Sequence, residues 1–242
     1  MCNKINIDGI DIIYYSCVES TNDIALNISA LSAYLTVISD TQTGGRGRMD
    51  RKFFSYDGGL YMSICIPFEN ISVPFHLITP SAALAVREAL EHFGIKNINI
   101  KWVNDLLIDN KKICGILTQA KSCNGKIERV VVGIGINLTK PENDFPDEIK
   151  NRAGYADYKG DKLTLAAEIS NNLRNILTLS QEEIVSKYRE KMAYIGETMQ
   201  VTDYSDNNKK VLGKIIGVND DCFLRIMTED GKEKIISSGE VI

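Results

Sequence analysis

A Gly- and Arg-rich segment, residues 42–54, carries the side chains best suited to bind an anion. Its glycines, Gly44, Gly45 and Gly47, remove side chains where the backbone must approach a ligand. Its cations can neutralise a polyphosphate or an acyl phosphate; they are Arg46, Arg48, Arg51 and Lys52. The segment does not match a P-loop, and no G-x-G-x-x-G opens a helix after a strand. A solvated basic loop and a nucleic-acid-binding patch stay open as alternatives.

A second segment, Lys101–Leu106, places an amide and a carboxylate side by side between apolar stretches. These side chains, Asn104 and Asp105, could read the edge of a base and hold a divalent cation. By itself, an ordinary Asn-Asp turn is the simpler interpretation of the pair.

Two further segments carry candidate residues. Lys112 precedes the apolar Ile113–Leu117, and its ammonium would suit the stabilisation of charge in an acyl-adenylate transition state. A solvated strand end is the alternative. In Val130–Leu138, glycines permit close approach of a ligand and Asn137 could face a nucleotide, although an ordinary core strand has the same pattern.

The first half of the chain predicts helices and strands that would position these residues. Ser20–Asp23 can cap a short helix that ends before a strand at residues 35–39. Residues 40–57 read as a long polar loop, and residues 59–67 as a strand. Thr79-Pro80 opens a helix that stops at Gly94, with Pro in the first turn.

Further along, the pattern predicts extended segments, a hairpin and two helices. Residues 98–101 and 104–108 look extended, and Asn124-Gly125 joins strands at 112–121 and 127–136. Helices are expected at residues 163–179 and after Ser180, which has capping-box spacing to Glu183. The fold class is therefore α+β, with a mixed, mostly antiparallel sheet flanked by helices.

From about Gly196 the pattern changes to short β segments separated by Asp-Asn and Asp-Gly turns. This change divides the chain into residues 1–194 and a small β-barrel-like domain at residues 195–242. No flexible linker is evident between them, so we expect the two parts to pack directly.

Composition narrows the function classes. The 242 residues are 44% hydrophobic and 25% charged, which is globular, and the net charge of −4 argues against a dedicated nucleic-acid binder. The two histidines and scattered cysteines offer little for His-based catalysis, a zinc site or disulfides. No long apolar run or leader-like start is present, so we expect a cytoplasmic protein with no membrane contact.

The motifs, taken together and in this order, resemble the biotin–protein ligase family. The matching elements are Ser20-Thr21-Asn22, Gly45–Lys52, Lys101–Asp105, Lys112–Leu117 and Gly133–Asn137. The resemblance covers residues 16–138 strongly, and the β-rich tail matches the family's SH3-like C-terminal domain. It implies a class II synthetase-like catalytic domain at residues 1–194 and an SH3-like domain at 195–242.

The resemblance also implies a role for each matching position. Biotin would be bound by Ser20, Thr21, Asn22, Gln42, Gly45, Arg46, Lys112 and Gly115. ATP and the adenylate would be bound by Arg48, Arg51, Phe53, Asn104 and Asn137, and Mg²⁺ by Asp105. Catalysis would rest on Lys112, Arg46 and Arg48.

Four positions, in three places, depart from the family pattern. Val103 stands where Pro is common, Met49-Asp50 replaces Arg-Gly in the adenylate loop, and Phe53 replaces a common Trp. The lost Arg and the gained Asp make the loop less cationic than the family pattern. Binding of the adenylate by the loop is the implied role that these departures affect most. Phe53 keeps an aromatic face for stacking.

The activity that the resemblance implies is formation of biotinyl-5'-AMP from biotin and ATP, then transfer of biotin to a lysine of a biotin carboxyl carrier domain. The alternatives are a lipoate or octanoate ligase of the same superfamily, and a biotin-binding protein without catalysis. A DNA-binding regulator is disfavoured, since the stretch before Ser20 is too short for a helix-turn-helix domain and we expect no specific DNA binding. The sequence leaves open whether the chain forms a homodimer.

Overall fold

The computed structural model describes residues 2–29, 31 and 33–242. Its large sheet has the strand order β1-β2-β3-β4-β8-β7-β6-β5. The strands are β1 (Cys2–Ile7), β2 (Ile10–Val18), β3 (Leu35–Gln42), β4 (Gly59–Pro67), β5 (Asn99–Lys101), β6 (Asp105–Ile108), β7 (Lys111–Cys123) and β8 (Lys126–Asn137). Neighbouring strands run antiparallel except β2 and β3, which are parallel. The predicted mixed, mostly antiparallel sheet is confirmed.

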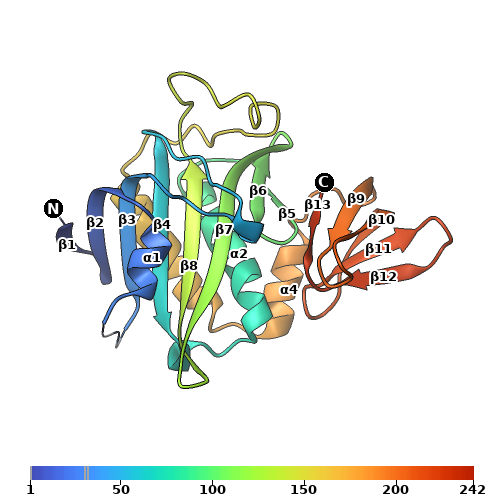
Figure 1. Cartoon of the computed structure of the whole chain (residues 1–242), viewed down its shortest axis with the longest axis horizontal. Helices are drawn as coiled ribbons and strands as arrows, with labels where there is room; N and C mark the ends of the chain where they lie inside the picture. Colours follow the sequence, from blue (N-terminus) through green and yellow to red (C-terminus); the bar gives the residue numbers. More distant parts are fainter. Residues whose placement is uncertain (1, 30, 32) are drawn as a thin grey trace.

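Helices cover both faces of this sheet (Figure 1). On one face, α1 (Thr21–Leu26) packs over β3, β4 and β8. On the other, α2 (Ile78–His92) and α3 (Lys162–Ile176) pack against each other and bury the main core. Because adjacent residues of a strand point to opposite faces, Val37 packs toward α1 while Ile38 belongs to the main core. This double covering explains why β4 is buried along its whole length.

The predicted helix signals are confirmed. The hydroxyl of Ser20 accepts a hydrogen bond from the backbone N–H of Asp23, which caps α1. The last helix, α4 (Gln181–Arg189), begins at the predicted capping box of Ser180 and Glu183. Within the part of the chain that the structure describes, no helix combines the length and apolarity that a membrane crossing requires.

The N-terminal hairpin of β1 and β2 was not predicted. It places β2 parallel to β3, with Ile13 opposite Val37. The crossover between these parallel strands contains α1, so the hairpin fixes where α1 leaves the sheet. The start of α1 consequently lies over the centre of the sheet (Figure 1).

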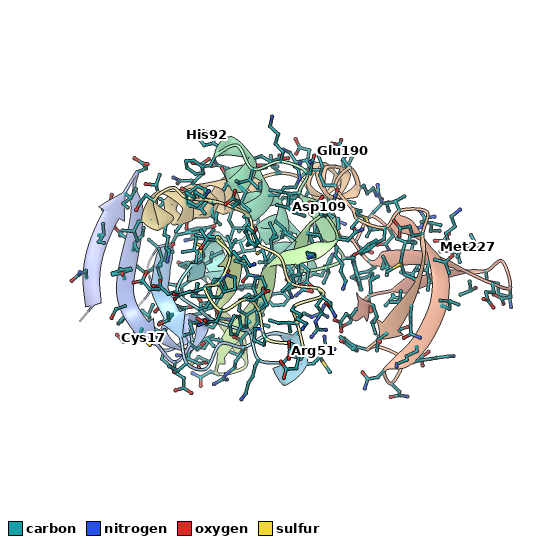
Figure 2. All side chains as sticks on the ribbon, turned by 90° about the horizontal axis from the view of Figure 1, so that it is seen from above. Cys17, Arg51, His92, Asp109, Glu190 and Met227 are labelled. Atoms are coloured by element: carbon teal, nitrogen blue, oxygen red, sulfur yellow. The ribbon has the colours of Figure 1, made fainter. Side chains whose placement is uncertain are left out.

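The C-terminal residues form a separate antiparallel sheet with the order β12-β11-β10-β9-β13. Its strands are β9 (Thr198–Asp203), β10 (Lys209–Val218), β11 (Leu224–Thr228), β12 (Glu233–Ile236) and β13 (Gly239–Val241). The predicted change to short strands near Gly196 is confirmed. Viewed from above, this sheet lies beside the large sheet, with Arg51 near the boundary between them (Figure 2).

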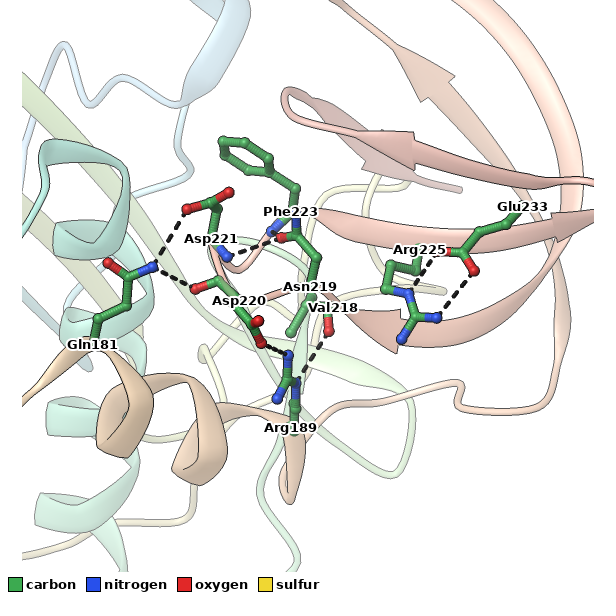
Figure 3. A network of polar contacts seen from close by, with 9 residues as sticks. All are labelled: Gln181, Arg189, Val218, Asn219, Asp220, Asp221, Phe223, Arg225 and Glu233. Carbon is green, nitrogen blue, oxygen red and sulfur yellow. Dashed lines mark hydrogen bonds and ion pairs between the residues drawn. The ribbon is translucent and has the colours of Figure 1, made fainter.

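Specific bonds join the C-terminal sheet to the rest of the molecule. The indole N–H of the buried Trp102 donates to the carbonyl of Cys222 at 2.9 Å. Arg189 of α4 donates to the carbonyl of Val218 and to the carboxylate of Asp220, at 3.0 and 2.7 Å (Figure 3). Gln181 at the start of α4 adds a 2.7 Å bond to the carbonyl of Asp220. The two parts therefore pack directly, as predicted from the absence of a linker.

Candidate active site

A cavity of about 430 Å³ opens over β7 and β8 and extends to the C-terminal sheet. It gathers nearly all the site residues predicted from the sequence: Ser20, Thr21, Asn22, Gln42, Arg46, Arg48, Arg51, Phe53, Asn104, Asp105, Lys112, Gly115 and Asn137. Gly45 was also predicted to line it but does not. Gly45 is buried behind Phe53, whose backbone N–H donates to the Gly45 carbonyl at 2.9 Å.

One end of the cavity is neutral and polar. The side-chain carbonyl of Gln42 accepts from the Thr21 backbone N–H at 2.8 Å and from the Thr21 hydroxyl at 3.2 Å. The hydroxyl of Ser63, fully buried on β4, lies 2.7 Å from the Thr21 hydroxyl. This network holds Thr21, at the start of α1, against Gln42. Ser63 was missed, although a hydroxyl within an apolar strand was a usable signal.

Asn22 supports this end of the cavity. Its amide N–H donates to Gln119 at 2.7 Å, and its carbonyl accepts from Ser63 at 2.6 Å. A Cβ on Gly133 would overlap the Asn22 carbonyl and lie 2.7 Å from its Cγ. Gly133 therefore keeps open the space that Asn22 fills, and Asn22 is 7% exposed.

The floor of the cavity is built from glycines beneath an aromatic ring. A Cβ on Gly135 would lie 2.6 Å from the ring of Phe53, and a Cβ on Gly115 would lie 3.0 Å from the ring and from Nζ of Lys112. The glycines of β7 and β8 thus allow Phe53 to lie against the sheet. Phe53 also meets Tyr61 edge to face, with ring centroids 6.2 Å apart.

Lys112 and Asp105 form an ion pair inside the cavity, with Nζ and Oδ1 2.6 Å apart. The Asp105 side chain is 13% exposed and that of Lys112 37%. The strand edge at Lys112 is covered, because its N–H donates to the Arg152 carbonyl and its C=O accepts from Gly154. Lys112 is therefore not the solvated strand end of the alternative interpretation.

Asp105 has the chemistry of a magnesium ligand. Its Oδ1 is buried and lies next to the Lys112 ammonium without a well-aligned hydrogen bond. Within the described part of the chain, no three His, Cys, Asp or Glu side chains come together to form a metal site. A cation here would therefore rely on Asp105, water and substrate oxygens, which is the arrangement that Mg²⁺ commonly adopts with phosphates.

The amides of Asn104 and Asn137 are both tied to backbone. Asn104 donates to the Ile116 carbonyl at 3.0 Å, and Asn137 donates to the Gly154 carbonyl at 2.8 Å. These bonds fix how each side chain is presented to the cavity. Asn104 lies in the turn between β5 and β6, as the simpler interpretation expected, and its side chain also accepts a bond from Arg48 of the basic loop at 3.2 Å.

The basic loop closes on itself and bends over the cavity. Gly47 donates to the Arg51 carbonyl at 2.6 Å, and Met49 adopts a φ of 55° within a short 3₁₀ turn, η1 (Arg48–Asp50). Arg46 pairs with Asp23 at 3.0 Å and is 54% exposed, so its side chain reaches the start of α1. The side chain of Asp50 lies outside the described part of the structure.

Sequence reasoning missed several cavity residues. Tyr204 and Glu240 come from the C-terminal sheet, and Arg152 comes from the loop after β8. Lys101, the first residue of the Lys101–Asp105 motif, also lines the cavity, although no role was predicted for it. Burial lowers the pKa of the Lys101 ammonium, which the nearby Asp105 and Glu240 carboxylates partly oppose. Arg152, Tyr204 and Glu240 could be found only by bringing distant segments together.

The cavity is strongly cationic although the chain is acidic. Among the described residues, its basic side chains are Arg46, Arg48, Arg51, Lys52, Lys101, Lys112 and Arg152, and its carboxylates are Asp105 and Glu240. A pocket with this balance of charge favours a polyanion. Next to it lies the neutral polar end, so one cavity can hold an uncharged polar group and a polyphosphate together.

Comparisons with known proteins agree with this geometry. Residues 14–137 match the family model described as "Biotin/lipoate A/B protein ligase family", and residues 194–242 match "Biotin protein ligase C terminal domain". The chain is 32% identical to the "Bifunctional ligase/repressor BirA" of Bacillus subtilis, over 97% of this chain and 75% of that protein. It is 31% identical to a "Biotin--[acetyl-CoA-carboxylase] ligase" of Paracoccus denitrificans, over 57% of this chain and 62% of that protein.

A solved structure has the same architecture. The biotin protein ligase from Aquifex aeolicus in complex with biotin and ATP matches with a TM-score of 0.80 and 30% identity, covering 96% of this chain and 97% of that one. The family model spans half of the chain, and the Bacillus relative covers nearly all of it. The chain therefore belongs to the biotin–protein ligase family.

Proposed function

We propose that the chain forms biotinyl-5'-AMP from biotin and ATP and then transfers biotin to a lysine of a biotin carboxyl carrier domain. The observation that carries this proposal is the single cavity that joins a neutral, hydrogen-bonding end to a cationic end. Biotin has a polar ureido ring and a carboxylate, and ATP supplies the polyphosphate. We further propose residues 1–194 as the catalytic domain and 195–242 as its C-terminal partner.

Biotin would enter with its ureido ring at the start of α1. Ser20, Thr21 and Gln42 offer donors and acceptors there, and Ser63 keeps Thr21 in place. Apolar residues, including Met62 and Ile134, line the same cavity and suit the hydrocarbon chain. The carboxylate would then lie near Lys112, at the boundary between the neutral and cationic ends.

In the first step, a carboxylate oxygen of biotin attacks the α-phosphorus of ATP, and the bond to pyrophosphate breaks. Lys112 would bridge the carboxylate and the α-phosphate, so that its charge offsets the repulsion between two anions. Asn104 and Asn137 would contact the adenine region, and Phe53 would offer an aromatic face. Arg48, Arg51 and Arg46 would hold the loop near the adenylate.

Asp105 would hold Mg²⁺, because its nearly buried carboxylate lines the part of the cavity proposed for the phosphates. The bound ion would neutralise negative charge on the phosphates. Lys112 lies 2.6 Å from the same carboxylate, so Asp105 also orients the catalytic ammonium.

In the second step, the neutral amine of the acceptor lysine attacks the carbonyl of biotinyl-AMP. An amide forms, AMP leaves, and the amine loses a proton. The mixed anhydride is open to hydrolysis, so the closed loop would keep water away until the acceptor arrives.

A lipoate or octanoate ligase is the second candidate, because the matched family model includes lipoate enzymes. The hydrogen-bonding set of Ser20, Thr21 and Gln42 favours a ureido ligand, since a plain acyl chain would leave these groups unpaired. A biotin-binding protein without catalysis would keep this pocket but would not need the Lys112–Asp105 pair.

The test is pyrophosphate release from the purified chain with ATP and either biotin, lipoate or octanoate. We expect release with biotin alone, biotinyl-AMP by mass spectrometry, and labelling of a purified biotin carboxyl carrier domain. Release with lipoate but not biotin would support the second candidate. Biotin binding with no pyrophosphate would mean that the protein binds without catalysis.

A further inference from the structure

The cations of the basic loop are held by the C-terminal sheet. Nη1 of Arg51 lies 2.6 Å from Oε1 of Glu240, which is part of β13. The hydroxyl of Tyr204, just after β9, donates to the other Glu240 oxygen at 3.0 Å. The Glu240 carboxylate thus binds Arg51 of the loop with one oxygen and Tyr204 of its own domain with the other.

Arg48 makes a second connection across the same boundary. Its Nη1 donates to the Gly239 carbonyl at 3.0 Å and to Asn104 at 3.2 Å. Its guanidinium lies over the ring of Tyr204, 5.6 Å from the centroid, a cation–π geometry. Arg48 therefore joins the loop to both sheets at once.

The C-terminal side of this contact is anchored. β13 pairs with β9, with Gly239 opposite Asp203, and the Tyr204 N–H donates to the Ser238 carbonyl at 2.8 Å. The same sheet is bound to the rest of the molecule through the Trp102–Cys222 bond and through the Arg189–Asp220 bond, which Figure 3 shows. Glu240 and Tyr204 are therefore presented to the loop from a fixed platform.

The contacts of Glu240 keep its carboxyl group ionised. Burial alone would raise the pKa of its carboxyl, but the bonds from Arg51 and Tyr204 lower that pKa on balance. The side chain is 24% exposed, so water screens the pair only partly. The carboxylate is ionised at neutral pH, and the contact with Arg51 is present there.

We propose that Glu240 and Tyr204 are positioning residues that hold the loop at residues 45–52 closed, so that the C-terminal sheet sets how long biotinyl-AMP stays bound. This inference rests on the proposed function, because it concerns retention of that intermediate. The loop's own backbone bonds fix its local shape, and the side chains of Arg48 and Arg51 tie that shape to the C-terminal sheet across the boundary.

The experiment measures the lifetime of biotinyl-AMP on the enzyme. The chain is loaded with labelled biotin and ATP, and release is followed after addition of excess unlabelled biotin. Glu240→Gln should shorten the lifetime by about tenfold, the size expected for loss of a charge-assisted hydrogen bond. Tyr204→Phe should shorten it less, because the ring over Arg48 remains. Thermal melting confirms that each variant is folded.

Glu233→Gln is the matched control. Glu233 pairs with Arg225 on the same sheet (Figure 3). Neither residue lines the cavity, so the lifetime should match that of the unaltered chain. A double-mutant cycle separates positioning from general damage. If Glu240 acts through Arg51, Glu240→Gln should add little to the effect of Arg51→Ala.

The outcomes distinguish the two proposals. If the unaltered chain forms no biotinyl-AMP, the proposed function fails. If it forms the intermediate but Glu240→Gln and Tyr204→Phe release it at the unaltered rate, the positioning role is overturned. Additive effects of Arg51→Ala and Glu240→Gln would also overturn it, since independent residues give additive changes.

Discussion

At the scale of single residues, Lys112 is more constrained than its sequence context indicates. A lysine at a strand end is expected to contribute almost nothing to stability, yet Lys112 pairs with the nearly buried Asp105. Its backbone also pairs with residues 152–154, beyond the end of β8. The ammonium is therefore held in one place, as a charge-stabilising group requires.

Lys112→Met should lower kcat for pyrophosphate release by about 10²–10³-fold, comparable to the loss of one preorganised oxyanion donor. Because Asp105 loses its partner, we also expect a fall of about 1 kcal/mol in the free energy of unfolding. Lys112→Arg should recover only part of the activity, since a wide planar group replaces a compact charge. Lys111→Met, on the exposed neighbouring residue, is the control. Near-normal release from folded Lys112→Met would refute the assignment.

Gly133 is a second residue whose role depends on close approach. Gly133→Ala would drive a methyl group into Asn22, which Ser63 and Gln119 hold in place. We expect the free energy of unfolding to fall by about 1–3 kcal/mol, as in other overpacked interiors, and the KM for biotin to rise. Gly47→Ala should be mild, because its Cβ would come no closer than 3.4 Å to any atom. Equal effects in urea titrations of the two variants would contradict this view of the pocket.

At the scale of elements, the basic loop has a short turn and backbone bonds of its own, and side chains tie it to the C-terminal sheet. Arg48→Gly should leave biotin affinity largely intact, because Arg48 contacts Asn104 and the C-terminal sheet rather than the α1 end of the cavity. Biotinyl-AMP should escape and label lysines of a bystander protein such as albumin. Arg48→Lys should escape less, since it keeps the charge but not the branched contacts. Lost biotin affinity without extra bystander labelling would show that the loop assignment is wrong.

At the scale of the whole molecule, the junction of the two sheets connects the site to a distant part of the chain. Trp102 lies within the Lys101–Asp105 motif, and its indole N–H satisfies the Cys222 carbonyl in a buried position. The residue that follows, Val103, leads directly to Asn104, the partner of Arg48. Disturbance at the junction should therefore reach the loop.

Trp102→Phe should lower the free energy of unfolding by about 1–3 kcal/mol, because the buried Cys222 carbonyl loses its donor. Urea denaturation measures this change, and the lifetime of bound biotinyl-AMP should shorten in the same direction as in Glu240→Gln. Arg189→Gln, at the more exposed contact of the same junction, should cost less. An unchanged unfolding curve for Trp102→Phe would mean that other contacts carry the junction.

Much of the fold could be predicted from the sequence because its signals are local. The strand at β4 and the hairpin of β7 and β8 follow from apolar runs and an Asn-Gly turn, and Ser180 with Glu183 marks the start of α4. The candidate site residues could also be predicted, because Lys112, Asn104 and Asn137 each lie in a short contiguous motif. Departures such as Phe53 for Trp were visible at the same level.

Only the tertiary structure shows which groups meet. Arg51 and Glu240 are 189 residues apart in the chain, and Asn22 and Gln119 are 97 apart, so no local pattern could link them. The burial of Gly45 behind Phe53, the hidden role of Ser63 and the entry of Arg152 into the cavity have the same cause. Backbone periodicity depends on near neighbours, whereas the composition of a cavity depends on how whole sheets pack, and packing is decided by contacts between residues distant in sequence.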